Sequence, residues 1–302
     1  MKIRVILVIL GVLMMKVTVV AQQDDHEFSV YAGGGLSSLH YKLTEGKGGG
    51  GGGGDFGLGY TYTHSIEKVT GTGKVYRQQW GVFTGLGFGV YNGKAKLNDV
   101  QTVTTGLTDG EKEYDRFDMY STLSGYTEHQ NTVYLHIPVM AKFQIDQYYV
   151  MGGFKMGIPL NGKYQTRNAT LTNRAYYRDL NNWAETQEFV GLGKYNLKRS
   201  NGDLDMSMFV ALSLEGGIKW ELGDNFSLYT GLYFDIGLNN VAKSGYQPFM
   251  DYRPGSQSHP ENFSLTTNSA LTSYTDDSQL APFTNKVNMM AVGVKVRLAY
   301  LK

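Results

Sequence analysis

Eight stretches of the chain alternate between apolar residues and small or polar ones, and this alternation limits the fold more than any other feature. In an extended strand, successive side chains point to opposite faces, so a period of two gathers the apolar side chains on one face. The alternating stretches are residues 28–36, 55–62, 80–90, 133–143, 148–158, 208–220, 226–236 and 290–300. The sequence therefore predicts an all-β fold built from eight strands.

The connections between these stretches alternate in length. Residues 145–147 and 223–225 are short turn sequences, whereas residues 92–130, 159–206 and 239–285 are long and polar. Because consecutive antiparallel strands run in opposite directions, every second connection lies at the same end of the sheet. Short turns at one end and long loops at the other are typical of outer-membrane barrels. We therefore predict an eight-stranded antiparallel up-and-down transmembrane β-barrel.

The alternation alone is also compatible with a secreted soluble barrel, which would bury its apolar face. Aromatic residues near the predicted strand ends favour the membrane alternative, because such residues form girdles at the two membrane interfaces. They are Phe28, Tyr60, Tyr62, Trp80, Phe143, Tyr148, Trp220, Phe226 and Tyr300.

Three features next to the strands need separate predictions. Residues 64–78 are long for a periplasmic turn, and we expect the two flanking strands to continue past the membrane as a hairpin around Gly71-Thr72-Gly73. The seven consecutive glycines Gly48–Gly54 lack the helix and Lys-Ser/Thr sequence of a phosphate-binding loop, so we predict a flexible loop entering the second strand. A ten-stranded barrel would need residues 112–124 and 188–198, which are too charged or irregular to be favoured.

The first residues have the pattern of a secretory signal peptide. Lys2 and Arg4 precede an apolar run over residues 5–15, and Val19 and Ala21 occupy the −3 and −1 positions of a cleavage site. A membrane-spanning helix is the alternative, but it needs about 20 apolar residues.

Cleavage after Ala21 divides the chain into two parts. We predict a signal peptide over residues 1–21 and a single barrel domain over residues 22–302, located in the bacterial outer membrane. The chain has no cysteine, which excludes disulfides and thiol chemistry. Its formal net charge is +1 and its basic residues form no cluster, so we expect no nucleic-acid partner.

The polar face of the strands would line the barrel lumen. The interior of an eight-stranded barrel is just wide enough for side chains to fill it. Charges held in so narrow a space must pair, since an isolated buried charge costs several kcal/mol. The expected lumen residues are Asp55, His136, Lys142, Lys155, Glu215, Lys219, Glu221, Asp235, Lys295 and Arg297. We predict a plugging ion-pair network centred on Lys142, Lys155, Glu215, Asp235 and Lys295 or Arg297.

Two other functions remain open. A small-solute pore would leave part of the lumen unfilled. A lipid-modifying enzyme would need a nucleophile, a base and an orienting acid within hydrogen-bond reach. His136, Ser213 and Glu215 are of the right types, but no nucleophile elbow accompanies them. The histidines lack metal-ligand spacing. We therefore expect no catalytic residue, no metal and no cofactor.

The long connections hold most of the remaining sequence. They are rich in Tyr, Asn, Asp and Thr, residue types that form adaptable contact surfaces. Tyr176-Tyr177-Arg178 and Phe249-Met250-Asp251-Tyr252 are the expected contact patches for an unknown extracellular ligand. The acidic pairs Asp115 with Asp118 and Asp276 with Asp277 could hold calcium, but a solvated loop is the favoured interpretation.

Four segments carry a resemblance to a known family. They are Gly57-Leu58-Gly59-Tyr60-Thr61-Tyr62, Trp80-Gly81-Val82-Phe83-Thr84-Gly85-Leu86-Gly87, Leu135-His136-Ile137-Pro138-Val139 and Met151-Gly152-Gly153-Phe154-Lys155-Met156-Gly157-Ile158-Pro159. The chain resembles the small outer-membrane β-barrel proteins of Bacteroidetes, often labelled porin-family proteins. The resemblance implies an eight-stranded barrel among outer-membrane lipids, assembled by the barrel-insertion machinery, with no assigned activity. Such barrels commonly end in an aromatic residue, whereas Leu301 and Lys302 follow Tyr300 here.

Overall fold

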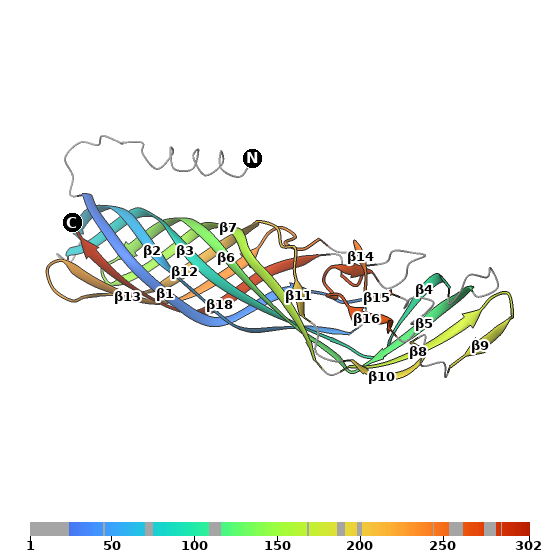
Figure 1. Cartoon of the computed structure of the whole chain (residues 1–302). Coiled ribbons are helices and arrows are strands. Elements are labelled where there is room, and N and C mark those ends of the chain that lie inside the picture. Colours follow the sequence, from blue (N-terminus) through green and yellow to red (C-terminus); the bar gives the residue numbers. More distant parts are fainter. Residues whose placement is uncertain are drawn as a thin grey trace.

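The computed structural model describes most of the chain, as an all-β structure (Figure 1). The described residues are 24–44, 46–69, 75–108, 116–167, 169–185, 191–197, 201–243, 245–253, 262–274, 282–284 and 286–302. The expected signal peptide, residues 1–21, lies outside them. Among the described residues, no helix is long and apolar enough to cross a bilayer.

Eight long strands form a closed ring. They are β1 (Asp24–Tyr41), β2 (Lys47–Val69), β3 (Val75–Leu97), β6 (Tyr126–Ile145), β7 (Tyr148–Arg167), β12 (Phe209–Glu221), β13 (Phe226–Gly237) and β18 (Val287–Leu301). Each pairs antiparallel with the next, and β18 pairs with β1 to close the ring. The predicted eight-stranded antiparallel barrel is confirmed. Closure leaves no unpaired strand edge in the ring.

The ring strands continue beyond the predicted stretches at the end where the long connections begin. The prediction of a flexible loop over Gly48–Gly54 was wrong, because these glycines belong to β2. Gly48 pairs with Ala95 and Gly54 with Val90, with a β-bulge between Gly50 and Gly54. The backbones of β1 and β3 lie on both sides of the run and supply hydrogen-bond partners, which outweighs the low strand propensity of glycine.

The hairpin between β2 and β3 follows the prediction. The two strands stay paired as far as Val69 and Val75, well past their apolar stretches. The predicted turn at Gly71-Thr72-Gly73 lies outside the described residues. The long join near residues 64–78 is therefore an extension of the sheet.

A second sheet stands beyond the ring, at the end away from the C-terminus (Figure 1). Its strands are β4 (Val100–Thr108), β5 (Arg116–Ser124), β8 (Ala169–Tyr177), β9 (Asn182–Ala184) and β10 (Gly193–Leu197). Two connections expected to be long loops, residues 92–130 and 159–206, therefore build a sheet of their own. The stretches 112–124 and 188–198, considered for a ten-stranded barrel, supply β5 and β10 to this sheet and not to the ring.

Further short strands lie outside the eight long strands and the second sheet. β11 (Asn201–Asp203) pairs with β7, and the last connection contributes two further pairs. These pairs are β14 (Gln247–Pro248) with β17 (Ser273–Tyr274), and β15 (Met250–Arg253) with β16 (Ser264–Thr267). Figure 1 shows β14, β15 and β16 between the ring and the second sheet. The last connection therefore lies at the mouth of the barrel.

Candidate functional site: the barrel interior

The outer wall of the ring carries an apolar band in its part away from the second sheet, which we call the lower part. Leu58 is 63% exposed and Leu232 is 66% exposed, although both are large apolar side chains. Similar exposed residues occur on every ring strand, among them Phe28, Leu36, Phe56, Val82, Leu86, Val139, Val150, Phe154, Leu214, Phe234, Val294 and Val296. An apolar band around a closed ring is the surface that lipid tails cover.

The inner wall behind this band is polar and buried. Its buried polar and charged residues include Glu27, Ser29, Asp55, His136, Lys142, Lys155, Ser213, Glu215, Asp235, Lys295 and Arg297. The usual arrangement of a soluble protein is thus inverted, with charges inside and apolar residues outside. This inversion distinguishes a membrane barrel from a soluble one.

Lys155 links two acidic residues inside the barrel. Its Nζ lies 2.6 Å from Oδ2 of Asp235 and 3.5 Å from Oδ2 of Asp55. Asp55 comes from β2, which is not a neighbour of β7 in the ring. This contact therefore crosses the lumen and does not follow the wall.

The chain of ion pairs continues through Lys295. Its Nζ lies 3.3 Å from Oδ2 of Asp55 and 3.4 Å from Oε2 of Glu215. The other Glu215 oxygen accepts a hydrogen bond from the guanidinium of Arg297. Six charged side chains from five strands are thus connected, running from Asp235 to Arg297.

A second group of charges surrounds Glu27. Its carboxylate lies 3.0 Å from Nζ of Lys219 and 3.6 Å from Nζ of Lys142. Lys142 also donates a hydrogen bond of 2.8 Å to the hydroxyl of Tyr229, which in turn donates to Glu27. These four residues come from β1, β6, β12 and β13, so this group also spans the interior.

The six residues expected in one network fall into these two groups. Lys155, Glu215, Asp235, Lys295 and Arg297 join the first, whereas Lys142 joins the second. Asp55, expected only to face the lumen, is what connects Lys155 to Lys295.

Two assignments at the rim of the barrel differ from expectation. Glu27 was not predicted to face the lumen, because it precedes the first apolar residue of the alternating pattern. Extending the alternation back from Ser29 and Tyr31, which face the lumen, would have placed Glu27 on the same face. Glu221, expected in the lumen, is exposed because β12 ends there and water reaches its side chain.

Aromatic rings fill the space between the charges. Lys295 Nζ lies 4.8 Å from the ring centre of Tyr233, and the Arg297 guanidinium lies 4.3 Å from that of Phe83. Both distances are in the range of cation–π attraction. Gly87 leaves room for the Tyr31 hydroxyl and the His136 ring, because a Cβ at this position would clash with both.

The residues considered for catalysis do not form a relay in the described structure. Ser213 donates a hydrogen bond of 2.5 Å to Asp235, and Glu215 contacts Arg297 and Lys295. His136 Nε2 lies 3.9 Å from Asp55, and neither ring nitrogen has a hydrogen-bond partner among the described residues. No cluster of His, Asp and Glu suited to a metal ion occurs within the part of the chain that the structure describes.

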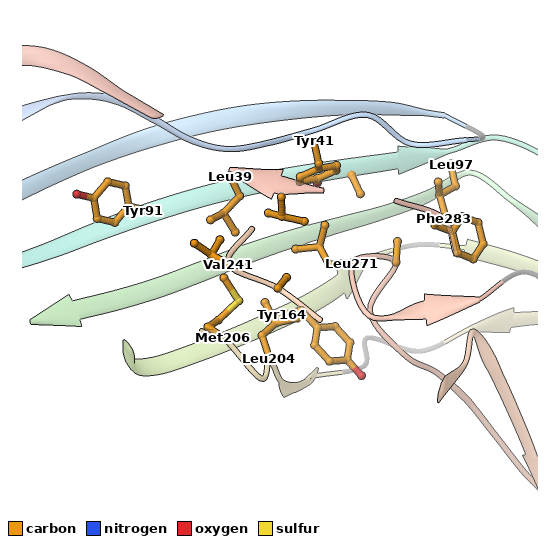
Figure 2. Close-up of a cluster of buried hydrophobic side chains, with 14 of the residues drawn as sticks. Leu39, Tyr41, Tyr91, Leu97, Tyr164, Leu204, Met206, Val241, Leu271 and Phe283 are labelled. Carbon is orange, nitrogen blue, oxygen red and sulfur yellow. The ribbon is translucent and has the colours of Figure 1, made fainter. Parts of the chain in front are cut away.

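Above the apolar band, the polarity of the wall reverses. The interior there is an apolar core, and Figure 2 shows Leu39, Tyr91 and Leu97 from the ring facing Val241, Leu271 and Phe283 from the last connection. The outer wall at this height carries polar residues such as Asn131 and Lys163. This end of the ring therefore surrounds an apolar core, to which the last connection contributes side chains.

Glu128 fastens the last connection to the wall above the band. Its carboxylate accepts hydrogen bonds from Ser269 Oγ at 2.5 Å, the Ala270 amide at 2.9 Å, the Tyr126 hydroxyl at 2.7 Å and the Gln130 side chain at 2.8 Å. Burial raises the pKa of Glu128, and these four donors only partly oppose the rise.

The second sheet has one buried and one exposed face. Phe117, Met119 and Ala175 are buried. On the other face Trp183 is half-exposed, with its ring centre 4.9 Å from that of Tyr120 and 5.0 Å from that of Tyr176. We call Tyr120, Tyr176 and Trp183 the aromatic face.

The two expected contact patches have different outcomes. Tyr176 is part of the aromatic face and Arg178 is exposed, with its Nε 2.5 Å from Asp118, but Tyr177 is buried. The patch at Phe249-Met250-Asp251-Tyr252 was wrong, because its three large apolar side chains are buried in the cores that the last connection forms. Asp115, Asp276 and Asp277 lie outside the described residues.

A closed antiparallel ring of eight strands, with an apolar outer band and buried charges inside, is the architecture of an outer-membrane β-barrel protein. Residues 20–243 match the family described as outer membrane protein beta-barrel domain, and the chain belongs to this family. The protein thus resides in the outer membrane in contact with its lipids. No curated protein matches the sequence significantly.

Proposed function

We propose that the barrel is a closed membrane anchor that holds a rigid extracellular domain for binding. In this proposal the lumen conducts no solute and the protein carries out no chemical step. Residues 1–21 direct export as a signal peptide and are then cleaved, and the barrel-insertion machinery places residues 22–302 in the membrane. The observation that carries the proposal is the series of ion pairs through Lys155, Asp55 and Lys295, which crosses the lumen at the height of the bilayer.

Two features support a lumen that is blocked to solutes. The side chains of Lys155 and Arg297 are 2% and 1% exposed, so water reaches neither of them from the lumen ends. The apolar core of the last connection covers the barrel from above. A solute would have to displace both layers, and separating buried charge pairs costs about 3–5 kcal/mol for each pair that loses a partner.

Current recordings from planar bilayers test whether the lumen is blocked. We expect no stepwise conductance from the purified wild-type protein, with a conducting porin reconstituted in the same way as the control. Regular single-channel steps that scale with the number of inserted barrels would replace this proposal with the pore.

The aromatic face supports the binding role. Tyr and Trp side chains offer large contact areas with little loss of conformational freedom. Arg174, whose guanidinium lies 4.7 Å from the Trp183 ring centre, adds a charged group beside them. The sheet behind is held by a buried core, so the face is preorganised.

Binding is tested with an array of immobilised glycans and secreted proteins. Purified wild-type protein should retain ligands that the Tyr120→Ser/Trp183→Ser variant loses. The Thr170→Ala/Lys194→Ala variant alters the same sheet away from the three rings and is the control. Equal binding by all three proteins would exclude the aromatic face.

A further inference from the structure

The seven-glycine run leaves part of the outer wall without side chains. Two hollows adjoin there and share Gly50 and Gly51 as lining residues. One, of about 430 Å³, is lined mainly by apolar residues, among them Leu36, Phe234 and Val292. The other, of about 850 Å³, crosses β2, β3, β6, β7 and β11 and is lined mainly by polar residues.

The polar hollow begins where the apolar band ends. On β3 the outward residues change from Leu86, Phe88 and Val90 to Asn92 and Lys94. Each residue advances about 3.3 Å along a strand, so the polar hollow starts within about 7 Å of the last apolar side chain. This height corresponds to the lipid headgroups of the outer leaflet.

Positive charge gathers around the polar hollow. Lys94 and Lys163 line it, together with the imidazole of His129. Lys94 stands directly opposite His129 in the strand register. Burial, together with the charges of Lys94 and Arg167, lowers the pKa of His129 below its ordinary value, so this imidazole offers a hydrogen bond and no charge at neutral pH. Asp203 is the one acidic residue in the lining, and it stands opposite Lys163 at the far edge.

A like-charged pair lies beside the hollow. Lys47 and Lys96 face each other directly across β2 and β3. Two like charges at such positions repel each other and destabilise the sheet. Among the described residues, neither lysine forms an ion pair with a carboxylate, and neither does Lys94. An anion at this position would remove the repulsion.

We propose that the glycine-walled surface binds a phosphorylated glycolipid of the outer leaflet. An acyl chain lies in the apolar hollow against Leu36 and Phe234. The phosphate lies near Lys94 and His129, with Lys47 and Lys96 beside it, and the sugar contacts Asn92 and Asn131. The Gly48–Gly54 run thus has a role: side chains there would separate the two hollows that one amphiphilic molecule occupies.

The probe is diphosphoryl lipid A added to the detergent-purified protein, with the bound fraction measured by native mass spectrometry. The Lys94→Ser/Lys96→Ser variant should bind it roughly tenfold more weakly for each lysine, the scale of one hydrogen bond to a charged group. The Lys194→Ser/Lys302→Ser variant removes two exposed lysines elsewhere and should bind like the wild type. Equal affinity in both variants would overturn the proposal.

Two further variants test the hollows. Gly52→Leu has room for its Cβ, whose nearest heavy atom would be 4.0 Å away, and it fills the polar hollow. Ser38→Phe fills the apolar one. Both should weaken binding while leaving heat-dependent gel mobility, which reports barrel folding, unchanged. Normal binding by folded variants would contradict the assignment.

Two more measurements distinguish the phosphate of a lipid from free inorganic phosphate as the bound group. Enzymatically dephosphorylated lipid A should bind at least tenfold more weakly than the diphosphoryl form. Inorganic phosphate at equal concentration should not displace the lipid. Equal binding of the dephosphorylated lipid, or displacement by phosphate alone, would exclude a phosphorylated lipid as the ligand.

Discussion

The ammonium group of Lys155 lies 2.6 Å from a carboxylate oxygen of Asp235, although the strands that carry them, β7 and β13, are separated by β12. Contacts of this kind join parts of the wall that have no backbone hydrogen bonds to each other. They therefore oppose both slippage of strand register and widening of the barrel.

Removing one partner of this pair should destabilise the barrel strongly. Lys155→Met leaves Asp235 and Asp55 buried without their shared cation, and we expect a loss of about 3–5 kcal/mol in the free energy of unfolding. Lys155→Met/Asp235→Leu should recover part of this loss. Urea unfolding followed by tryptophan fluorescence measures both. Lys243→Met breaks an exposed pair with Asp205 and should change stability by about 0–1 kcal/mol.

Opening the lumen should create conductance. Glu215→Ala/Arg297→Ala removes two of the buried lumen side chains together, so no single charge is left without its main partner. We expect ion-conducting steps in planar bilayers, whereas Trp183→Ala, on the second sheet, should remain silent. A silent double variant that is folded would show that the apolar mouth alone closes the barrel.

Glu128 should make the attachment of the last connection dependent on pH. Its pKa is raised above 4.5 by burial, so the folded state holds this proton more tightly than the unfolded state does. The contribution to stability is therefore complete below about pH 4.5 and falls as pH rises towards the raised pKa.

Hydrogen exchange over residues 262–274 tests this dependence. Protection, corrected for the intrinsic exchange rate, should decline with rising pH in the wild type. Glu128→Gln cannot ionise and should show little dependence. A wild-type profile identical to that of Glu128→Gln would contradict the prediction.

Gly87 should tolerate no larger residue. In Gly87→Val the side chain would meet the Tyr31 hydroxyl and the His136 ring, and overpacking of this kind costs about 1–3 kcal/mol or more. Gly216→Ala is a matched control, since its Cβ would be 3.6 Å from the nearest atom. Heat-dependent gel mobility should show an unfolded fraction only for the first variant.

Much of the membrane-spanning barrel could be predicted from alternation alone. The period of two assigns each residue to a face, so lumen residues such as Lys155 and Glu215 follow from the pattern without coordinates. The pattern could not show that Lys155 contacts Asp55 from β2, because that contact depends on how far the ring curves before it closes.

The part of the chain beyond the apolar band was predicted less well, for a physical reason. Phe249 and Met250 lie in a polar connection with no sustained period, so nothing local indicates that they are buried. Gly48–Gly54 carries no side chains, so it has no pattern to interpret, and its strand exists only because β1 and β3 pair with it.

The sequence by itself determined the number of strands, their direction and the polarity of each face within the membrane, since these follow from side-chain spacing and connection length. Only the tertiary structure decided which charges pair, where the wall reverses its polarity and which residues of the last connection join the apolar core. Those outcomes depend on ring closure, which brings together residues that are distant in the chain and buries their side chains in one narrow interior.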